Sequence, residues 1–289
     1  MFERLELLYR LWFARVEISN KVKYFLLENY REEEIFFMSK EELYCLGLSL
    51  KQVERIRDLR YKIKLDDMLA RMISEGIKQI KYTDRFYPKL LRNIEDKPVY
   101  IFIKGNLDII NNTSFAMVGS RNASISGLKI ARSLAYKIAK NNINIVSGLA
   151  YGIDTASHIG ALDYEEGKTI AVLGNGLLEE DLYPKSNLRL YKDILAKGGL
   201  IVSEYVIGTK PEKYHFPARN RIISGLSEKV IVVEASKNSG SLITVDFALE
   251  QGRDVYAVPG NILDNNSKGV NSLIKEGAKV LDSYEDLID

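Results

Sequence analysis

The sequence predicts an α/β protein in which a doubly wound, mostly parallel sheet follows a small α-helical domain. Three observations support this prediction. Up to about residue 70, apolar residues recur at helical spacing. From residue 114 onward, short runs such as INIVSG, TIAVLG and KVIVVEA are continuously apolar, which is typical of parallel strands covered on both faces. Helical stretches separate these runs, and repeated βα order of this kind indicates a doubly wound sheet.

Residues 1–70 are expected to form the helical domain. Its first helix has one apolar stripe, made of Leu5, Leu8, Leu11 and Trp12. Ser19 has the position of an N-cap for the second helix, and SKEE, which begins at Ser39, has the spacing of a capping box. Two short helices then meet at Gly47. The LGLS turn resembles the hairpin of helix-hairpin-helix DNA-binding modules, although most such turns only join helices.

Residues 71–289 are expected to form the sheet domain. Its first part, residues 71–113, mixes the short strands IKQIKY and VYIFIKG with turns at Pro88 and Pro98, and we interpret it as an entry segment onto the sheet. The helices expected between the later strands are ISGLKIARSLAYKIAK, IDTASHIGALD, SNLRLYKDILAK and GSLITVDFALEQG.

Composition excludes some functional classes. A formal net charge of +2 excludes a protein that coats polyanions through its overall charge, but it leaves room for a local basic groove. The single cysteine, Cys45, cannot form an internal disulfide and indicates a reducing compartment. The first residues carry charges throughout, unlike a signal peptide, and no apolar run approaches the roughly 20 residues of a spanning helix. We therefore expect a cytoplasmic protein without a membrane segment.

Small and polar residues follow each predicted strand. The loops GSRNAS, SGLAYGID, GNGL, SEY and EASKNSGS are expected at the carboxyl ends of the strands, and we call this row of loops the carboxyl edge. Ligands of open parallel sheets bind there, at the point where the strand order reverses. Small residues let a ligand approach the backbone, and helix N-termini offer free amides to anions. The sequence therefore predicts an anion-binding edge.

The carboxyl edge lacks the fingerprint of a nucleotide cofactor. Gly119, Ser120 and Arg121 are followed by no glycine before Gly127, so the first loop does not read G-x-G-x-x-G, and no Walker A motif is present. We expect neither NAD nor ATP as a cofactor. Arg121 suits a bidentate phosphate clamp. The alternative is a surface arginine that pairs with a neighbouring carboxylate.

Residues that could support catalysis are few. Two histidines and one cysteine leave almost no material for a zinc or thiol site, and no metal is expected. Asp154 and His158 stand four residues apart on one helix face, where they could act as acid and base or hold the helix against the sheet. Glu204 and Glu234 both end strands, so spacing alone leaves a hydrolase pair open. No G-x-S-x-G motif is present.

A basic segment with aromatic residues lies near the carboxyl edge. From Lys185 to Arg221 there are eight Lys or Arg and three Asp or Glu. Loops are expected to hold Lys185, Lys213, Arg219 and Arg221, with Tyr183, Tyr214 and Phe216 among them. Proteins that bind single strands combine cations along the backbone with aromatic faces for the bases. The alternative is a solvated, charged turn.

Several motifs together resemble the DNA-processing protein A family (DprA, also called Smf). They are MVGSRNAS, VSGLAYGIDTASHIGAL, KTIAVLGNGL, YPKSN, GLIVSEY, FPARNRIISGLS, VVEASKNSGSLITVDFALEQGRDVYAVPGN and SKGVNSLIKEGA. The resemblance runs from about residue 77 to the C-terminus and implies an extended Rossmann-like fold. The N-terminal helices are similar to the family's sterile-alpha-motif-like (SAM-like) domain. The chain ends soon after GAKVLDSYEDLID and is expected to lack the winged-helix-like domain of some members.

The resemblance implies a non-catalytic protein that binds single-stranded DNA. Such proteins protect incoming strands during natural transformation, load the RecA recombinase onto them and work as homodimers joined through the Rossmann-like domain. Arg121 would hold a phosphate and Phe216 would stack on a base, whereas Arg219 and Arg221 could instead brace the loop through Glu204 or Glu234. The dimer surface would lie near Leu273 and Ile274. The positions implied in DNA binding are Gly119, Ser120, Arg121, Ser147, Gly148, Gly174, Lys185, Lys213, Phe216, Arg219, Asn220 and Arg221.

Two other functions remain open at this stage. The first is a nucleotide-processing hydrolase of the phosphoribohydrolase type on a related Rossmann-like fold. Such enzymes typically carry a PGG-x-GT-x-x-E stretch, whereas the corresponding region here reads SKNSGSLITVDFALE. The second is a structural adaptor that binds the recombinase but not DNA.

Overall fold

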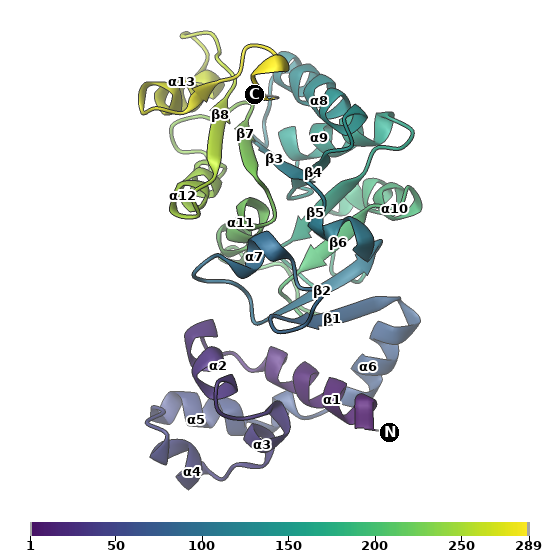
Figure 1. Cartoon of the computed structure of the whole chain (residues 1–289), viewed down its shortest axis with the longest axis vertical. Coiled ribbons are helices and arrows are strands. Elements are labelled where there is room, and N and C mark those ends of the chain that lie inside the picture. Colours follow the sequence, from purple (N-terminus) through teal and green to yellow (C-terminus); the bar gives the residue numbers. More distant parts are fainter. Residues whose placement is uncertain (1, 288–289) are drawn as a thin grey trace.

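The computed structural model describes residues 2–287 and has a helical part below a large sheet (Figure 1). The helices of the N-terminal part are α1 (Phe2–Arg15), α2 (Asn20–Leu27), α3 (Glu32–Phe37), α4 (Lys40–Cys45), α5 (Leu50–Arg57) and α6 (Leu65–Ser74). Their presence confirms the predicted helical region.

Capping residues fix where these short helices begin. The Ser19 hydroxyl accepts a hydrogen bond from the amide of Val22 at the start of α2. Ser39 and Glu42 form the predicted capping box of α4, because each side chain bonds the other residue's backbone amide. Caps of this type stabilise a helix by about 1 kcal/mol. Gly47 has a φ of +83° between α4 and α5, a conformation that glycine adopts without strain.

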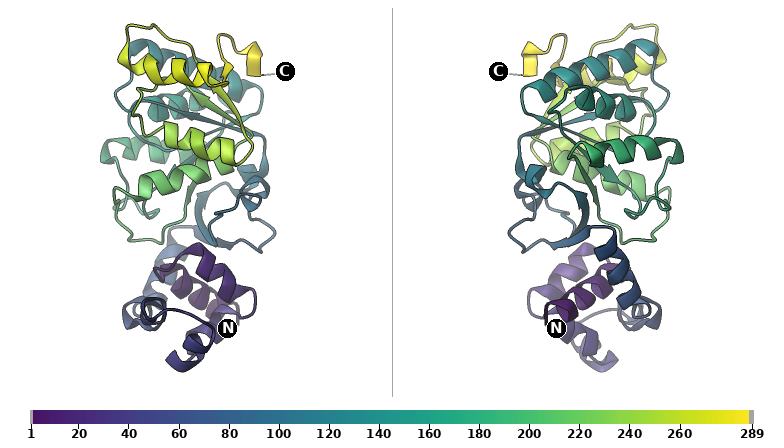
Figure 2. Two further views of the ribbon diagram at one scale, coloured as in Figure 1. Left: turned by 90° about the vertical axis from the view of Figure 1, so that its left-hand side faces the viewer. Right: turned by 90° about the vertical axis from the view of Figure 1, so that its right-hand side faces the viewer.

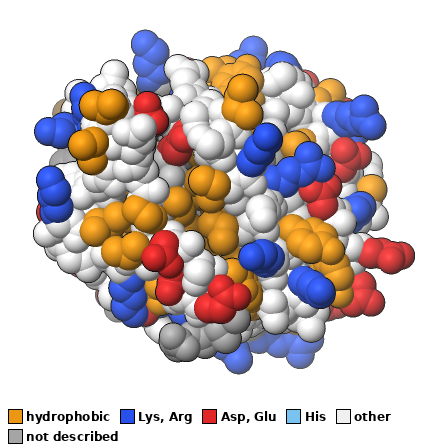
Figure 3. All heavy atoms as spheres, turned by 90° about the horizontal axis from the view of Figure 1, so that it is seen from above, with side chains coloured by type: hydrophobic (Ala, Val, Ile, Leu, Met, Phe, Trp, Pro, Cys, Tyr) orange, Lys and Arg blue, Asp and Glu red, His pale blue; other side chains and the backbone are white. Residues whose placement is uncertain are grey.

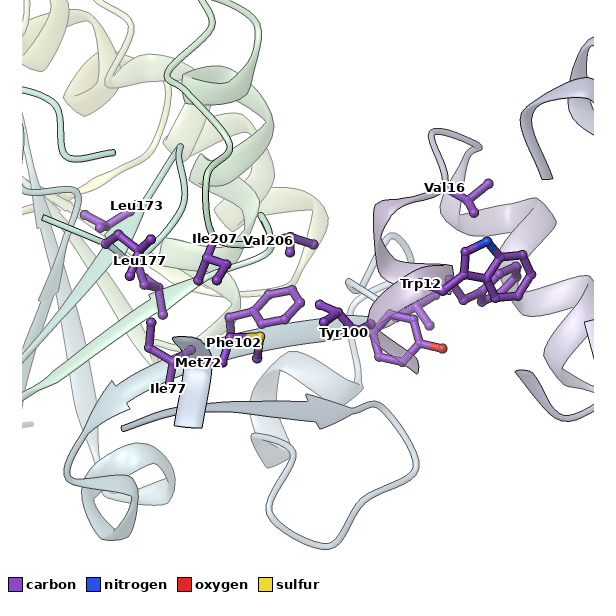
Figure 4. Packing of buried hydrophobic residues seen from close by; sticks show 14 of the residues in the cluster. Trp12, Val16, Met72, Ile77, Tyr100, Phe102, Leu173, Leu177, Val206 and Ile207 are labelled. Carbon is purple, nitrogen blue, oxygen red and sulfur yellow. The ribbon is translucent and has the colours of Figure 1, made fainter. Parts of the chain in front are cut away.

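The helical part and the sheet share one hydrophobic core. Leu11 and Trp12 of α1 are fully buried, whereas Leu5, predicted on the same stripe, is 42% exposed. Figure 4 shows the buried cluster running from Trp12 past Tyr100 and Phe102 to residues that follow β6. Because apolar side chains from both parts interlock, the helices are packed against the sheet rather than tethered to it.

The sheet is mostly parallel, as predicted. Its strand order is β1-β2-β6-β5-β4-β3-β7-β8-β9. Strands β1 and β2 pair antiparallel, β2 joins β6 antiparallel, and all the other pairs are parallel. The strands are β1 (Ile77–Lys81), β2 (Tyr100–Gly105), β3 (Ser114–Val118), β4 (Asn144–Ser147), β5 (Thr169–Leu173), β6 (Leu200–Ser203), β7 (Lys229–Val232), β8 (Asp254–Ala257) and β9 (Lys279–Val280).

Helices cover both faces of the sheet (Figure 2). One face carries α8 (Ile125–Lys140), α9 (Ile153–Asp163) and α10 (Leu188–Ala196). The other face carries α7 (Lys89–Arg92), α11 (His215–Gly225), α12 (Leu242–Glu250) and α13 (Lys268–Lys275). Along β3, Phe115 and Met117 pack in the cluster that includes α8, whereas Ala116 and Val118 pack in the cluster on the opposite face. This two-sided burial explains why the strand sequences are continuously apolar.

The strand order reverses between β3 and β7. The chain runs from β3 through β4 and β5 to β6 in one direction, and then returns to place β7 on the other side of β3. The loops that leave these two neighbouring strands therefore diverge and open a crevice at the carboxyl edge.

One segment predicted as loop is helical. Residues 215–225 form α11, so Arg219 and Arg221 lie on a helix rather than in a loop. The sequence gives few start signals there, because Tyr214 makes no side-chain capping bond and Pro217 interrupts the pattern. Pro217 is tolerated because it occupies the first turn, where backbone amides have no partner within the helix. Among residues 2–287, none of the helices has the length and apolar composition needed to cross a bilayer.

Candidate nucleic-acid interface

A cavity of about 670 Å³ opens at the point where the strand order reverses. It is bounded by residues 118–122 after β3, the first two turns of α11, and residues 239–244 around the start of α12. Ala150, Asp154, Tyr183, Pro211 and Lys213 also line it. The position is the one that the topology favours for a ligand.

Cations and aromatic rings lie together in this cavity. The guanidinium carbon of Arg121 is 5.5 Å from the centroid of the Phe216 ring, and the Tyr183 ring is 5.6 Å from it on a tilted plane. Arg121 and Lys213 are exposed, and within residues 2–287 neither side chain forms an ion pair or a hydrogen bond. The alternative in which Arg121 pairs with a carboxylate is therefore wrong. Both charges are available to an anion.

The loop that carries Arg121 is held from below by Glu234. The backbone carbonyl of Glu234 accepts the Ser120 amide at 2.7 Å, and its carboxylate accepts the amide and the hydroxyl of Ser124. Gly119 is required at the start of the loop, because a Cβ there would come within 2.8 Å of the Glu234 carbonyl oxygen. Glu234 thus positions the loop and the start of α8.

The loop after β4 forms the base of the site. Ser147 is buried and donates to the carbonyl of Met117, so it supports the loop without lining the cavity. Gly148 lines a small adjoining hollow, donates its amide to Asp154 and accepts from Arg219 at 2.7 Å. Arg219 is only 4% exposed. Burial lowers the pKa of Arg219 to about 10 and raises the pKa of Asp154, which the Arg219 charge opposes.

Gly174 packs against the ring of Phe216. A Cβ at this position would lie 3.1 Å from a carbon of the Phe216 ring, and the Gly174 carbonyl contacts Nδ1 of His215 at 3.1 Å. Asn220, one turn along α11, lines the cavity and donates to the carbonyl of Gly240 at 3.3 Å.

Five of the twelve predicted DNA ligands do not line the cavity, namely Ser147, Gly148, Gly174, Lys185 and Arg221. Arg221 is 4% exposed and points to the opposite side, where its guanidinium bonds both oxygens of Glu204 at 2.8 and 2.9 Å and also contacts Asp96. The Lys185 ammonium donates to the carbonyls of Glu179 and Glu180 at 3.0 and 2.7 Å. The predicted residues that the structure brings to the cavity are Gly119, Ser120, Arg121, Lys213, Phe216, Arg219 and Asn220.

The glutamates considered as a hydrolase pair are far apart. Glu204 follows β6 and Glu234 follows β7, and these strands are four positions apart in the sheet. At a strand spacing of about 4.8 Å, this separation is roughly 19 Å, whereas paired catalytic carboxylates of glycosidases lie within about 10 Å. Glu204 also accepts a hydrogen bond from Arg221, and Glu234 accepts one from the amide of Ser124.

His158 is held in a neutral, structural form. Its Nδ1 lies 2.7 Å from the Thr169 hydroxyl, which itself donates to the Ile145 carbonyl, so Nδ1 must carry the proton. The ring is fully buried, and burial, with the Arg219 charge, lowers the pKa of His158 to about 3. The interpretation that this residue holds α9 against the sheet is therefore favoured. The described residues contain no cluster of His, Cys, Asp and Glu suited to a metal ion.

The loop EASKNSGS was predicted at the carboxyl edge, but neither its residues nor those at the start of α12 were named as candidate site residues. Ser239, Ser241 and Thr244 line the cavity, as does Tyr183, which the sequence placed only near the basic segment. The stretch EASKNSGS contains small and polar residues after a strand, and this pattern could have pointed to the serines.

The predicted dimer residues lie on α13, at the end of the molecule shown in Figure 3. Leu273 and Ile274 are partly buried against the sheet core. Ile262 and Leu263, in the segment before α13, are 80% and 83% exposed. Figure 3 shows hydrophobic side chains in several clusters on this end, with lysines and arginines between and around them.

The fold and the site define a Rossmann-like α/β protein with cations and aromatic rings at the switch point of its sheet and without a dinucleotide fingerprint. Comparison with known proteins gives the family. The DNA recombination-mediator protein A family matches residues 78–289, and the chain belongs to this family. The expected resemblance is confirmed.

Named relatives agree with this assignment. DNA processing protein DprA of Streptococcus pneumoniae is 51% identical over 205 residues, which cover 71% of each chain. DprA of Bacillus subtilis is 43% identical over 227 residues, covering 78% of this chain and 75% of the relative.

Two solved structures share the fold. The X-ray structure of S. pneumoniae DprA superimposes with a TM-score of 0.70 at 39% identity, covering 94% of this chain and 97% of the other. A structure of Helicobacter pylori DNA processing protein A, described for its single-stranded DNA binding mode, gives a TM-score of 0.65 at 28% identity and covers 73% and 94% of the two chains.

Proposed function

We propose that this chain binds single-stranded DNA in the cavity at the switch point and acts as a recombination mediator in the cytoplasm. In this role it protects incoming strands during natural transformation and loads RecA onto them. The observation that carries the proposal is the group formed by Arg121, Lys213, Phe216 and Tyr183, with two unpaired cations beside two rings. The H. pylori relative, whose structure concerns single-stranded DNA binding, supports it.

The site suits an unpaired strand for a physical reason. Arg121 and Lys213 attract phosphates, and Phe216 and Tyr183 offer ring faces to bases. Every base has a stacking face, so such binding tolerates any sequence. In a duplex both faces of each base are covered by neighbouring pairs, and the rings then have nothing to stack on. We infer a preference for single strands and no chemical reaction.

A comparison of strands across salt concentrations tests this proposal. Fluorescence anisotropy with a labelled oligothymidylate and with a duplex of equal length measures both affinities. We expect tighter binding to the single strand and a linear fall of log K with log salt. Equal affinity for the two forms would contradict the proposal. Release of free base from nucleoside monophosphates would instead indicate the phosphoribohydrolase.

The assembly and the partners form a second part of the proposal. Residues 1–70 are proposed as the family's SAM-like domain and residues 71–289 as the DNA-binding domain. We propose a homodimer joined near Leu273 and Ile274, since exposed apolar residues lie beside them on the same end. Light scattering should give a dimer mass for the native chain and a monomer mass for Leu273→Arg. Leu249→Arg, at a 63% exposed position on α12, is the matched control and should remain dimeric.

RecA loading has its own test. The rate at which RecA assembles on a single strand should rise when the chain is added. The Arg121→Ala variant should raise it less, because loading depends on DNA held in the cavity. An equal rate with and without the native chain would contradict this part of the proposal.

A further inference from the structure

The start of α12 gives the cavity a second kind of wall. Ser239, Ser241 and Thr244, each of which carries a hydroxyl, are among the residues that line it, and we call these residues the hydroxyl wall. The hydroxyls of Ser239 and Ser241 lie 2.7 Å apart. The hydroxyl wall contains no lysine or arginine, in contrast to the wall formed by Arg121 and Lys213.

Backbone amides at this helix start are unused. The helix has nine residues, and the N-cap residue Ser241 makes no side-chain capping bond. Within the described chain, the amides of Gly240 and Ile243 have no acceptor, whereas those of Leu242 and Thr244 bond the carbonyls of Ser239 and Ser241. Free amides and the positive end of a helix dipole favour an anion at this position.

An unpartnered hydroxyl also indicates a ligand here. Thr244 is 1% exposed and lines the cavity, yet its Oγ1 has no hydrogen-bond partner among the described residues. A buried hydroxyl without a partner destabilises a protein, and native structures leave few of them. The other buried threonine beside the sheet, Thr169, donates to the Ile145 carbonyl. Of these two buried threonines, Thr244 is the one whose hydroxyl lacks a partner, and it lies in the lining of the proposed DNA-binding cavity.

We propose that the start of α12, with the hydroxyls of Ser239, Ser241 and Thr244, binds a second phosphate of the strand that Arg121 and Lys213 hold. The inference rests on the proposed function and adds a second phosphate contact to it, at the start of α12. Asp154 is the acidic residue in the cavity lining, and its carboxylate already accepts the amides of Gly148 and Ala150. The second phosphate is thus bound by dipoles and hydroxyls rather than by a cation.

The phosphate contact at α12 differs from the contact at Arg121 and Lys213 because it involves no cation. Salt dependence reports phosphates that lysines and arginines neutralise. Loss of a hydroxyl should therefore lower the affinity without changing the salt slope. Hydrogen bonds to charged groups are strong enough that Thr244→Val should weaken binding by about tenfold.

Neutral linkages in the DNA provide the decisive experiment. Oligothymidylates with a single methylphosphonate at successive positions are titrated against the native chain and Thr244→Val. We expect two sensitive positions for the native chain, and one of them should lose its sensitivity in the variant. If each neutral linkage weakens binding by the same factor in the native chain and in Thr244→Val, the two changes act independently at every position and the proposal is wrong. Oligonucleotides with and without a 5′-phosphate distinguish an internal phosphate from a terminal one.

Thermal unfolding shows whether a loss of DNA affinity is caused by a loss of stability. Thr244→Val removes no hydrogen bond, so its Tm should equal or exceed that of the native chain. Thr169→Val, the matched control, loses its hydrogen bonds to Ile145 and His158 and should lower Tm while leaving the DNA affinity unchanged. If the native chain fails to bind single strands, the proposed function falls. If it binds them and Thr244→Val binds equally well, this inference alone falls.

Discussion

Replacement of Arg221 tests whether this arginine braces the fold or holds DNA. The side chain is 5% exposed and bonds both oxygens of Glu204, the Asp96 carboxylate and the Ala218 carbonyl. Arg221→Leu keeps most of the volume but leaves Glu204 with Asn20 as its remaining hydrogen-bond partner in the described chain. Removing one member of a buried pair costs about 3–5 kcal/mol. Because the Glu204 side chain is 20% exposed, water compensates in part, and we expect the lower value.

The assay combines stability with DNA binding. A loss of about 3 kcal/mol lowers the Tm of a chain of this size by about 6 °C. At 20 °C the variant remains folded, and its salt slope for single-stranded DNA should match that of the native chain, since Arg221 does not line the cavity. Lys213→Ala is the matched control with the reverse outcome, an unchanged Tm and a flatter slope. An unchanged Tm together with a reduced slope in Arg221→Leu would refute the bracing role.

Three further predictions concern single residues. Phe216→Ala should weaken single-strand binding by about 1–3 kcal/mol in anisotropy titrations without changing the salt slope, because it removes a stacking face and no charge; an unchanged affinity would exclude stacking. Lys185→Ala should leave both affinity and slope unchanged, since its ammonium is engaged by two backbone carbonyls, and a flatter slope would restore its predicted DNA role. His158 is neutral in the fold, with a pKa of about 3 against 6.5 when unfolded, so its contribution to stability is complete above pH 6.5 and is lost as the pH falls toward 3. Denaturant titrations at several pH values should therefore show that the free energy of unfolding of His158→Asn depends on pH less steeply than that of the native chain, by about 1.4 kcal/mol per pH unit between pH 6 and 4. Equal pH dependences of the two free energies would contradict the buried neutral form.

Most of the fold follows from local patterns in the sequence. Continuous apolar runs marked the parallel strands, and the helix over residues 125–140 has the bounds that its apolar spacing predicts. The helix over residues 215–225 was missed because Pro217 lies in its first turn and no capping side chain precedes it. Its identification depends on tertiary packing, since seven of its eleven residues are buried between the sheet and neighbouring elements.

The candidate site was predictable where chemistry follows directly from a loop at the carboxyl edge. Arg121 and Phe216 lie as expected in one cavity. The direction of Arg221 could not be predicted, because it depends on Glu204, which approaches from a strand on the far side of the sheet's switch point. Thr244 was missed for a similar reason, since an unpartnered hydroxyl is recognisable only when all its neighbours are placed.

The salt dependence of single-strand affinity in Arg121→Ala tests the central claim most directly. The claim is that free cations at the switch point hold the phosphates of an unpaired strand. The slope of log K against log salt should be smaller in magnitude than that of the native chain by about 0.7, the contribution of one phosphate contact on a single strand. An identical slope and affinity in the two proteins would contradict the claim and would place the DNA elsewhere on the molecule.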